Sequence, residues 1–293
     1  MTQRASDVGE LAFRILGRRR PGTVTRAFQS AAYVRSANDF LVVLWGRLRS
    51  PLTVNVVGEA DQEDPPKVGE RCALGPEMIR LGENSIDVSG ARVYMSGLRE
   101  RRAVVLPPAK DLTRGVAMAK SLYEVSPAGP TLATDRALRA FVDKAVAPLA
   151  AGEPHMVHRK ESFAQLIGRG GGFTPAGDDF LGGFTATYNY FARCKGSREI
   201  SIPRKMLFAK TIPESAAILG YATKGYVDEV LERLILNTLG GVDFLEELLA
   251  LGHRGHTSGI DMSLGVLLSV AAISDSEQGG GALKECSAAL WHQ

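Results

Sequence analysis

The hydrophobic period of this 293-residue chain changes from strand-like to helical near residue 108, and that change constrains the fold more than any other feature. Between Thr23 and Leu106, short segments rich in β-branched and aromatic residues are separated by Gly, Pro, Asn and Asp, which is typical of strands. After Pro107 and Pro108, apolar residues recur at helical spacing. Because strands and helices are segregated rather than alternating, the pattern predicts an α+β fold and not a parallel βαβ sheet.

The first part of the chain, residues 1–110, is expected to be a mainly β domain built as an antiparallel sheet or small barrel. The expected strands are TVTRAF, FLVVLWGRL, LTVNVVG, SIDVSGARVYMSG and RRAVVLPP. Within the fourth, Ser89-Gly90 predicts a hairpin turn. Residues 7–16 have apolar side chains at helical spacing, which predicts a short amphipathic helix before the strands.

The second part, residues 111–293, is expected to be a mainly α-helical domain that carries two glycine-rich motifs. Apolar residues from Ala137 to Val146 indicate one helix. Prolines at 175, 203 and 213 stand where first-turn prolines belong. The further helices are expected near 160–167, 175–193, 203–210, 213–224, 226–239, 242–251, 258–273 and 281–291.

Composition narrows the class of protein. With 45% hydrophobic residues the chain can bury a sizeable core. Its net charge is +3, but the sequence has neither a basic face interleaved with aromatic residues nor a known nucleic-acid-binding motif. Three cysteines without a CxxC pair fit a reducing cytoplasm. The longest apolar run, residues 264–273, is shorter than the roughly 20 residues that span a bilayer. We therefore expect a cytoplasmic protein that binds neither membrane nor nucleic acid.

The first glycine-rich motif is Gly-Arg-Gly-Gly-Gly at residues 168–172, followed by a helix. Glycines allow positive φ and let a ligand approach backbone N–H groups. Thr174 is expected to cap the helix, with Pro175 at its first position. Because N–H groups and the helix dipole point the same way there, the motif predicts a small-anion site. Asp178 and Asp179 fall in the first turn, where they either complement the dipole or take part in function.

The second motif, GHTSGIDMSLGVLL at residues 255–268, repeats the design. Each stretch has a glycine, a hydroxyl cap, an aspartate one turn later and a Leu-Gly pair for close helix packing. Two interpretations stay open: two helices share one capping solution, or two helix N-termini converge on one ligand. The matching residues are Gly172, Thr174, Asp178, Leu181 and Gly182 in the first stretch, and Gly255, Thr257, Asp261, Leu264 and Gly265 in the second.

Side chains able to move protons or hold a metal accompany these motifs. His256, beside Thr257 and Ser258 at a helix start, is a candidate general acid or base, or a hydrogen-bond donor to a ligand. We expect no cofactor. The alternative is Mg²⁺ held by Asp178, Asp179 and Asp261, since hard carboxylate oxygens suit that ion.

A third hydroxyl-bearing stretch runs from Thr211 to Ser215. It either caps the helix expected at 213–224 or reaches the same pocket as the two glycine motifs.

The string GGFTPAGDDFLGG, followed by GHTSGID, resembles the signature of the AllH-like family, a domain named for a subunit of oxamate carbamoyltransferase in anaerobic allantoin breakdown. GTVTRAFQSAAYV, DFLVVLWG and SPLTVNVVG also look like that family's opening strands. The family usually has Pro at Gly171, Leu at Phe173 and a small polar residue at Ile260. By position, the resemblance carries over Gly170, Gly172, Thr174, Gly177, Asp178, Asp179, His256, Thr257, Ser258, Gly259 and Asp261.

The resemblance implies a subunit of an oxamate carbamoyltransferase-like enzyme. Such an enzyme moves a carbamoyl group between phosphate and oxamate, with oxalurate as the carbamoylated form, and acts with partner subunits. Its small anions would lie at Gly170, Gly171, Gly172 and the second motif, with Arg169 as a phosphate or carboxylate clamp. Two alternatives stay open, a non-catalytic anion-binding subunit or sensor and a metal-dependent hydrolase built on the aspartates. Association into a homo-oligomer is also left open.

Overall fold

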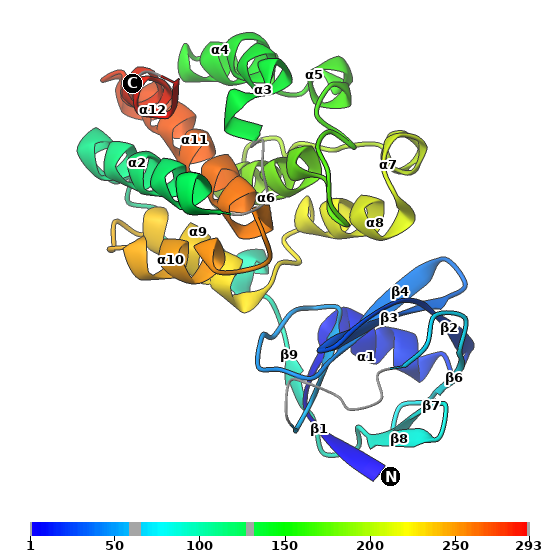
Figure 1. The fold of residues 1–293 in the computed structure, drawn as a ribbon. Coiled ribbons are helices and arrows are strands. Elements are labelled where there is room, and N and C mark those ends of the chain that lie inside the picture. The colour runs from blue at the N-terminus through cyan, green and yellow to red at the C-terminus, as the bar shows by residue number, and fades with distance from the viewer. Residues whose placement is uncertain (1, 59–65, 127–131, 292–293) are drawn as a thin grey trace. The chain divides into compact units, whose positions relative to one another are not determined.

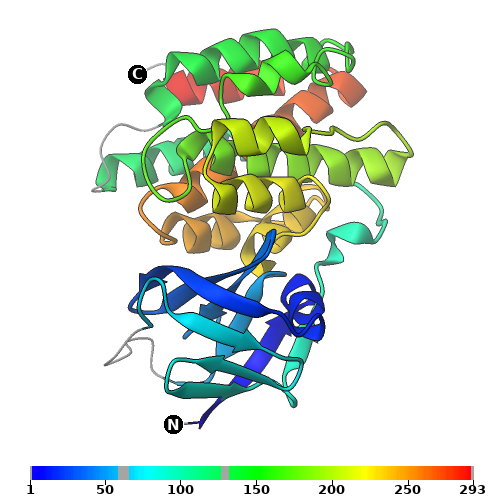
Figure 2. The same cartoon turned by 90° about the vertical axis from the view of Figure 1, so that its right-hand side faces the viewer.

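The computed structural model describes residues 2–58, 66–126 and 132–291, and the chain divides into two compact units. The first unit, Met1–Ser96, holds the strands and one helix, and the second, Gly97–Gln293, is helical (Figures 1 and 2). This order confirms the predicted α+β class. The domain boundary predicted at residue 110 falls at the second residue of α2 (Ala109–Val125).

The first unit is a small mixed β-barrel. The strands form a ring in the order β1, β5, β4, β3, β2, β6, β7 and β8, and the pairing of β8 with β1 closes it. Strand β9 pairs with the last residues of β1, beyond the part that pairs with β8. Most pairs are antiparallel, but β4–β5, β1–β8 and β1–β9 are parallel. The strands are β1 Thr2–Gly9, β2 Pro21–Phe28, β3 Ala31–Ser36, β4 Asp39–Leu44, β5 Thr53–Val56, β6 Arg71–Leu74, β7 Met78–Leu81, β8 Asn84–Asp87 and β9 Arg92–Tyr94.

Helix α1 (Glu10–Gly17) follows β1 directly, so the helix predicted over 7–16 was placed too early, and residues 7–9 are strand. The amphipathic pattern was correct, since Ala12, Ile15 and Leu16 are buried in the barrel core. Pro51 O accepts hydrogen bonds from the N–H groups of Leu11 and Ala12, 2.9 and 3.0 Å away. That carbonyl takes the place of a capping side chain at the helix start.

Two other predictions in this region were wrong. Ser89-Gly90 is not a hairpin turn, because β8 and β9 each pair in parallel with β1 instead of with each other. The segment RRAVVLPP is not a strand. Its Val105 makes an isolated bridge to Gly240. The first error arose because the long strand β1 was missed, and β1 takes the partners that a local pairing of β8 with β9 would have used.

The second unit is a helical bundle in which α6 and α11 are central (Figure 1). Helix α11 packs against α2, α4, α6, α9, α10 and α12. The helices predicted from residue 160 onward are confirmed. The helices after α2 are α3 Arg136–Phe141, α4 Ala147–Ala150, α5 Lys160–Ala164, α6 Ala176–Lys195, α7 Arg204–Lys210, α8 Pro213–Ala222, α9 Glu229–Thr238, α10 Leu245–Gly252, α11 Ser258–Gln278 and α12 Ala282–Trp291, with a π-helical turn at Val142–Val146.

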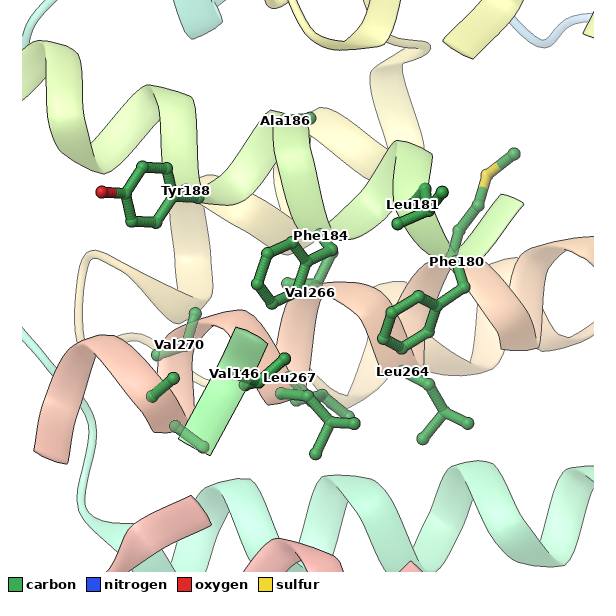
Figure 3. Close-up of a cluster of buried hydrophobic side chains, with 14 of the residues drawn as sticks. Val146, Phe180, Leu181, Phe184, Ala186, Tyr188, Leu264, Val266, Leu267 and Val270 are labelled. Carbon is green, nitrogen blue, oxygen red and sulfur yellow. The ribbon is translucent and has the colours of Figure 1, made fainter. Parts of the chain in front are cut away.

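The core of the bundle lies between α6 and α11, which are buried continuously over 177–192 and 259–274. Figure 3 shows Phe180 and Phe184 of α6 directed toward Leu264 and Leu267 of α11. By length and composition alone α11 could span a membrane, yet 89% of its most apolar window is buried inside the unit. A helix that is apolar on all sides and covered on all sides is a core helix.

Candidate functional site

The glycine-rich motif forms a tight turn immediately before α6. Gly168, Gly170 and Gly172 have φ of +76°, +98° and +96°, values that L side chains rarely adopt. A Cβ on Gly168 would also lie 2.0 Å from Lys210 O. The segment 170–172 is exposed. At its far end the turn folds back on the helix, because Gly177 N donates to Arg169 O at 2.8 Å.

Asp178 fastens this turn to α8. Its buried carboxylate accepts from Gly168 N at 2.7 Å and from the hydroxyls of Thr211 and Ser215 at 2.5 and 2.6 Å. Thr211 and Ser215 therefore do not cap α8, whose N-cap position is Ile212. With its acceptor positions used in this way, Asp178 holds the loop in place and is turned away from the second motif.

Helices α6 and α11 cross at two glycines in equivalent positions. Counted from Ala176 and Ser258, Gly183 and Gly265 are each the eighth helical residue. A Cβ on Gly183 would lie 2.0 Å from Met262 O, and one on Gly265 would lie 2.1 Å from Phe180 O. Each glycine thus faces the carbonyl of the fifth residue of the other helix, which gives the crossing a local two-fold symmetry.

This symmetry corrects the sequence alignment of the two motifs by one residue. The second and fourth helical positions hold Gly177 and Asp179 in α6, and Gly259 and Asp261 in α11. Asp179, not Asp178, is therefore the counterpart of Asp261. Gly182, predicted to pack closely, has room for a methyl group, since the nearest atom to its Cβ would be 4.0 Å away.

The two motifs meet, as their shared pattern predicted. Thr174 Oγ1 lies 2.9 Å from Ser258 Oγ, and both residues are half-buried. Thr174 does not cap α6, because the N-cap position is Pro175 and no side chain bonds there. The predicted cap was off by one residue, and the hydroxyl freed in this way joins the two loops instead.

Asp179 lies under this hydroxyl pair, with a residue exposure of 3%. Hydrogen bonding to the Ser258 and Thr174 side chains lowers the pKa of Asp179, but within the described residues its Oδ2 atom is buried without a hydrogen-bond partner. Burial is the main cause that raises the pKa of Asp179 well above its usual range, and the charge of Asp261 adds to it. Arg254 and the two hydroxyls act in the opposite direction.

Asp261 has the same character on the other helix. It is completely buried and accepts from Tyr123 Oη, and across the described chain its Oδ2 atom is also without a partner. Hydrogen bonding to the side chains of Tyr123 and Thr257 lowers the pKa of Asp261. Burial raises the pKa of Asp261 to about 7 against the effect of these two side chains. Two buried carboxyl groups, one from the first turn of each central helix, therefore stand close enough to influence each other.

The comparison with protein families falls on this same part of the chain. Residues 166–270 match the family of oxamate carbamoyltransferase subunit AllH. The match confirms the resemblance seen in the sequence, over a segment that contains both motifs and both buried aspartates. We refer to residues 166–270 as the AllH segment. Comparison with curated proteins and with solved structures found no match.

Other predicted site residues of the AllH segment lie at its surface. The Arg169 guanidinium donates from Nε to Asp135 at 2.6 Å, and this bond holds the pKa of Asp135 below its usual range. His256 is exposed, and its backbone carbonyl accepts from the Ser126 hydroxyl at 2.9 Å. Thr257 occupies the N-cap position of α11 without a capping hydrogen bond from its side chain, and it lowers the pKa of Asp261.

The magnesium alternative would need Asp178, Asp179 and Asp261 together. The Asp178 carboxylate accepts from Gly168 N and from the hydroxyls of Thr211 and Ser215. In residues 2–58, 66–126 and 132–291, no group of three or more His, Cys, Asp or Glu side chains is arranged to hold a metal ion.

The sequence predicted that the two motifs are adjacent and also that they line one pocket. Their contact confirms only the first of these predictions. A cavity of about 320 Å³ lies near Lys144, Arg159 and Gln165, and another of about 230 Å³ lies near Arg114 and Phe244. Neither is lined by residues of the two motifs. We call the place where the two motifs meet, joined by Thr174 and Ser258 beside the glycine turn, the junction.

Two contributors to the junction were missed in the sequence. Tyr123 belongs to α2, which was not predicted as a helix, and Arg254 precedes the second motif. Arg254 Nη1 donates to Asp228, the residue that caps α9, at 2.5 Å. An Asp followed by Glu and an apolar run at 228–231 was the available signal for that cap.

Proposed function

We propose that this chain is a subunit of an oxamate carbamoyltransferase in allantoin breakdown, acting with partner subunits. The observation that carries the proposal is the family match, because the AllH segment contains both glycine motifs and both buried aspartates. The contact between Thr174 and Ser258 supports it further, since it makes the two motifs one site.

The proposed ligands are the small anions of carbamoyl transfer: phosphate, carbamoyl phosphate, oxamate and oxalurate. In the described chain, no backbone hydrogen bond uses the N–H groups of Gly170, Gly171 or Gly172, which are exposed at the turn. The first-turn N–H groups of α11 begin on the other side of the Thr174–Ser258 contact. Groups of this kind bind anions and stabilise an oxyanion as it forms.

The proposed reaction needs no nucleophile from the protein. Phosphate itself attacks the carbamoyl carbon of oxalurate, and oxamate leaves. The protein has to orient two anions, stabilise the tetrahedral oxyanion and manage one proton. The backbone N–H groups of the glycine turn would stabilise the oxyanion. Arg169, now bonded to Asp135, would supply a clamp by exchanging that partner for a bound anion.

A non-catalytic anion-binding subunit is the second candidate. It is favoured by the placement of the carboxyl groups, because Asp179 and Asp261 are almost completely buried and cannot contact a substrate directly. In that case the reacting groups would belong to a partner subunit, and this chain would hold or sense the anion.

The deciding experiment is turnover of oxalurate plus phosphate by the purified chain, alone and with its candidate partner subunits, with carbamoyl phosphate as the measured product. We expect activity with the partners present. Formation of the complex without turnover, together with tight binding of phosphate or oxamate to this chain, would favour the non-catalytic subunit. The absence of both turnover and anion binding would refute the proposal.

A further inference from the structure

The junction of α6 and α11 has an imbalance of hydrogen-bonding groups that points to a missing proton. Asp179 Oδ2 and Asp261 Oδ2 are both buried acceptors without a donor in the described chain. Buried polar atoms in folded proteins almost always have partners, so two such atoms in one junction require an explanation. A single proton shared between them would give one atom a donor and the other an acceptor.

The surrounding charges do not remove the need for that proton. The charged and titratable groups facing the pair are Tyr123 from α2 and Arg254 from the turn before α11. Tyr123 donates to the other oxygen of Asp261, and Arg254 also bonds Asp228. Asp178, next to Asp179 in sequence, bonds on the opposite side. Two ionised carboxylates in this environment would repel each other with little solvent to screen them.

We propose that Asp179 and Asp261 share one proton, and that the hydroxyls of Ser258 and Thr174 connect it to the glycine turn as a proton-transfer path. Thr174 Oγ1 lies 2.9 Å from Ser258 Oγ, and either hydroxyl can donate to the other. The hydroxyl that accepts this bond keeps its own hydrogen for Asp179, whose pKa both side chains lower. Both residues are partly exposed. The local two-fold of the glycine crossing brings the aspartates together as equivalent residues.

The role of this path rests on the proposed function. When phosphate attacks oxalurate, a C–O bond forms and the C–N bond to oxamate breaks. The leaving nitrogen gains one proton, and hydrogen phosphate loses one. The pair gives its proton through the hydroxyls to the nitrogen and recovers one from the phosphate, so the step balances without an additional reactant. Asp179 and Asp261 act here through Ser258 and Thr174 and are positioning residues for the proton.

The first test needs no partner subunit and no activity. Infrared difference spectra of the chain against Asp179→Asn and Asp261→Asn at pH 6 to 8 should show the carbonyl band of a protonated carboxyl group, and each substitution should remove or shift it. Asparagine is nearly isosteric and its amide can donate the bond that the proton supplies, so both variants should fold. Absence of the band from the unmodified chain would overturn the proposal whatever the variants do.

A cation is the competing occupant of the same junction, and Mg²⁺, Na⁺ and K⁺ are its probes. We expect the carboxyl band and the melting temperature to be unaffected by each added salt beyond the effect of matched ionic strength. Loss of the band together with a rise in melting temperature that Asp261→Asn abolishes would show that a metal ion occupies the pair, and would overturn the shared proton.

The second test uses the complex with partner subunits. Thr174→Val should lower kcat for oxalurate by about 10- to 100-fold and change the pH profile, while KM changes little, because general acid catalysis contributes up to about 10²–10⁴-fold. Thr174→Ser keeps the hydroxyl and should restore most of the rate. An equal loss in both variants would mean that Thr174 acts through packing, which would overturn the path. If the band is present but the complex has no activity, the proposed function fails and the shared proton stands.

Discussion

Gly183 and Gly265 are equivalent residues of α6 and α11, and each lies against a backbone carbonyl of the other helix. The carbonyls belong to Met262 and Phe180, and the distances from a built Cβ would be 2.0 and 2.1 Å. The helices can therefore cross at backbone contact, which also brings Thr174 to Ser258 and Asp179 toward Asp261. The geometry of the site therefore depends on glycine at two buried positions, 183 and 265.

Gly183→Ala should destabilise the protein by at least about 1–3 kcal/mol, because the new methyl group would overlap Met262 O and the helices must separate. The matched control is Gly182→Ala on the same helix, where the nearest atom would be 4.0 Å from the Cβ. The control should be neutral or stabilising by about 0.5–1 kcal/mol. Urea denaturation of both variants measures the difference, and equal stabilities would contradict the described crossing.

The stability of the protein should fall as pH rises through the titration of Asp261. Burial raises the pKa of this group to about 7 from 3.8, so the folded state holds a proton that the unfolded chain releases. The contribution is complete below about pH 4 and is lost as pH rises toward and through 7. Asp261→Asn should flatten this dependence, while Asp143→Asn, at an exposed residue, should leave it unchanged. The measurement is the free energy of unfolding from pH 5 to 8. The same pH dependence in the unmodified chain, Asp261→Asn and Asp143→Asn would contradict the expectation.

Substitution of Gly172 should abolish binding of phosphate and oxamate with the fold intact. Its φ of +96° aims the backbone of the turn, and valine would move that backbone out of this conformation. Gly152→Val is the matched control, since Gly152 has a φ of +82°, no neighbour within 4 Å of its built Cβ and a position outside both motifs. Calorimetric titration should detect binding in the control alone. Unchanged affinity in a folded Gly172→Val protein would mean that the turn is not the anion site.

Removal of the Asp178 carboxylate should loosen the glycine turn before it affects the junction. Asp178→Ala leaves Gly168 N and the Thr211 and Ser215 hydroxyls without their acceptor, at a cost of about 2–4 kcal/mol. Asp178→Asn keeps one acceptor oxygen and should cost less. Hydrogen exchange should become faster at residues 168–172 in the alanine variant, with α11 protected as before. Uniformly faster exchange would indicate that Asp178 supports the whole unit.

The elements that the sequence predicted well are those whose burial pattern is repeated over several turns. Helices α6 and α11 were placed within a few residues because glycine, proline and hydroxyl residues mark their starts. Strand β1 was missed because TQRASDVG has few β-branched residues, and its partners come from distant segments. Helix α2 was missed because its apolar stripe is interrupted by Gly115, which is buried against Phe244 and Leu267.

The site was predictable as a meeting of two motifs but not in its internal contacts. Equal spacing was enough to expect that the loops at Thr174 and Ser258 approach each other. The same spacing chose Asp178 as the partner of Asp261, because a sequence cannot show whether a helix begins at Pro175 or at Ala176. One residue changes the direction of a helical side chain by about 100°, and this moved Asp178 to the loop side and Asp179 to the junction.

The way in which β1 closes the barrel has a consequence for biosynthesis. This strand is translated before all its partners, yet it pairs with β5, β8 and β9, the last of which ends at Tyr94. Until the ribosome has released β9, the part of β1 at Asp7, Val8 and Gly9 has unpaired backbone groups on that edge, which can recruit other nascent chains. High contact order of this kind slows folding. A chain stalled before β9 should therefore be a substrate for chaperones. The helical unit has the same requirement, because its central helix α11 packs against α2 and α6, which are translated long before it.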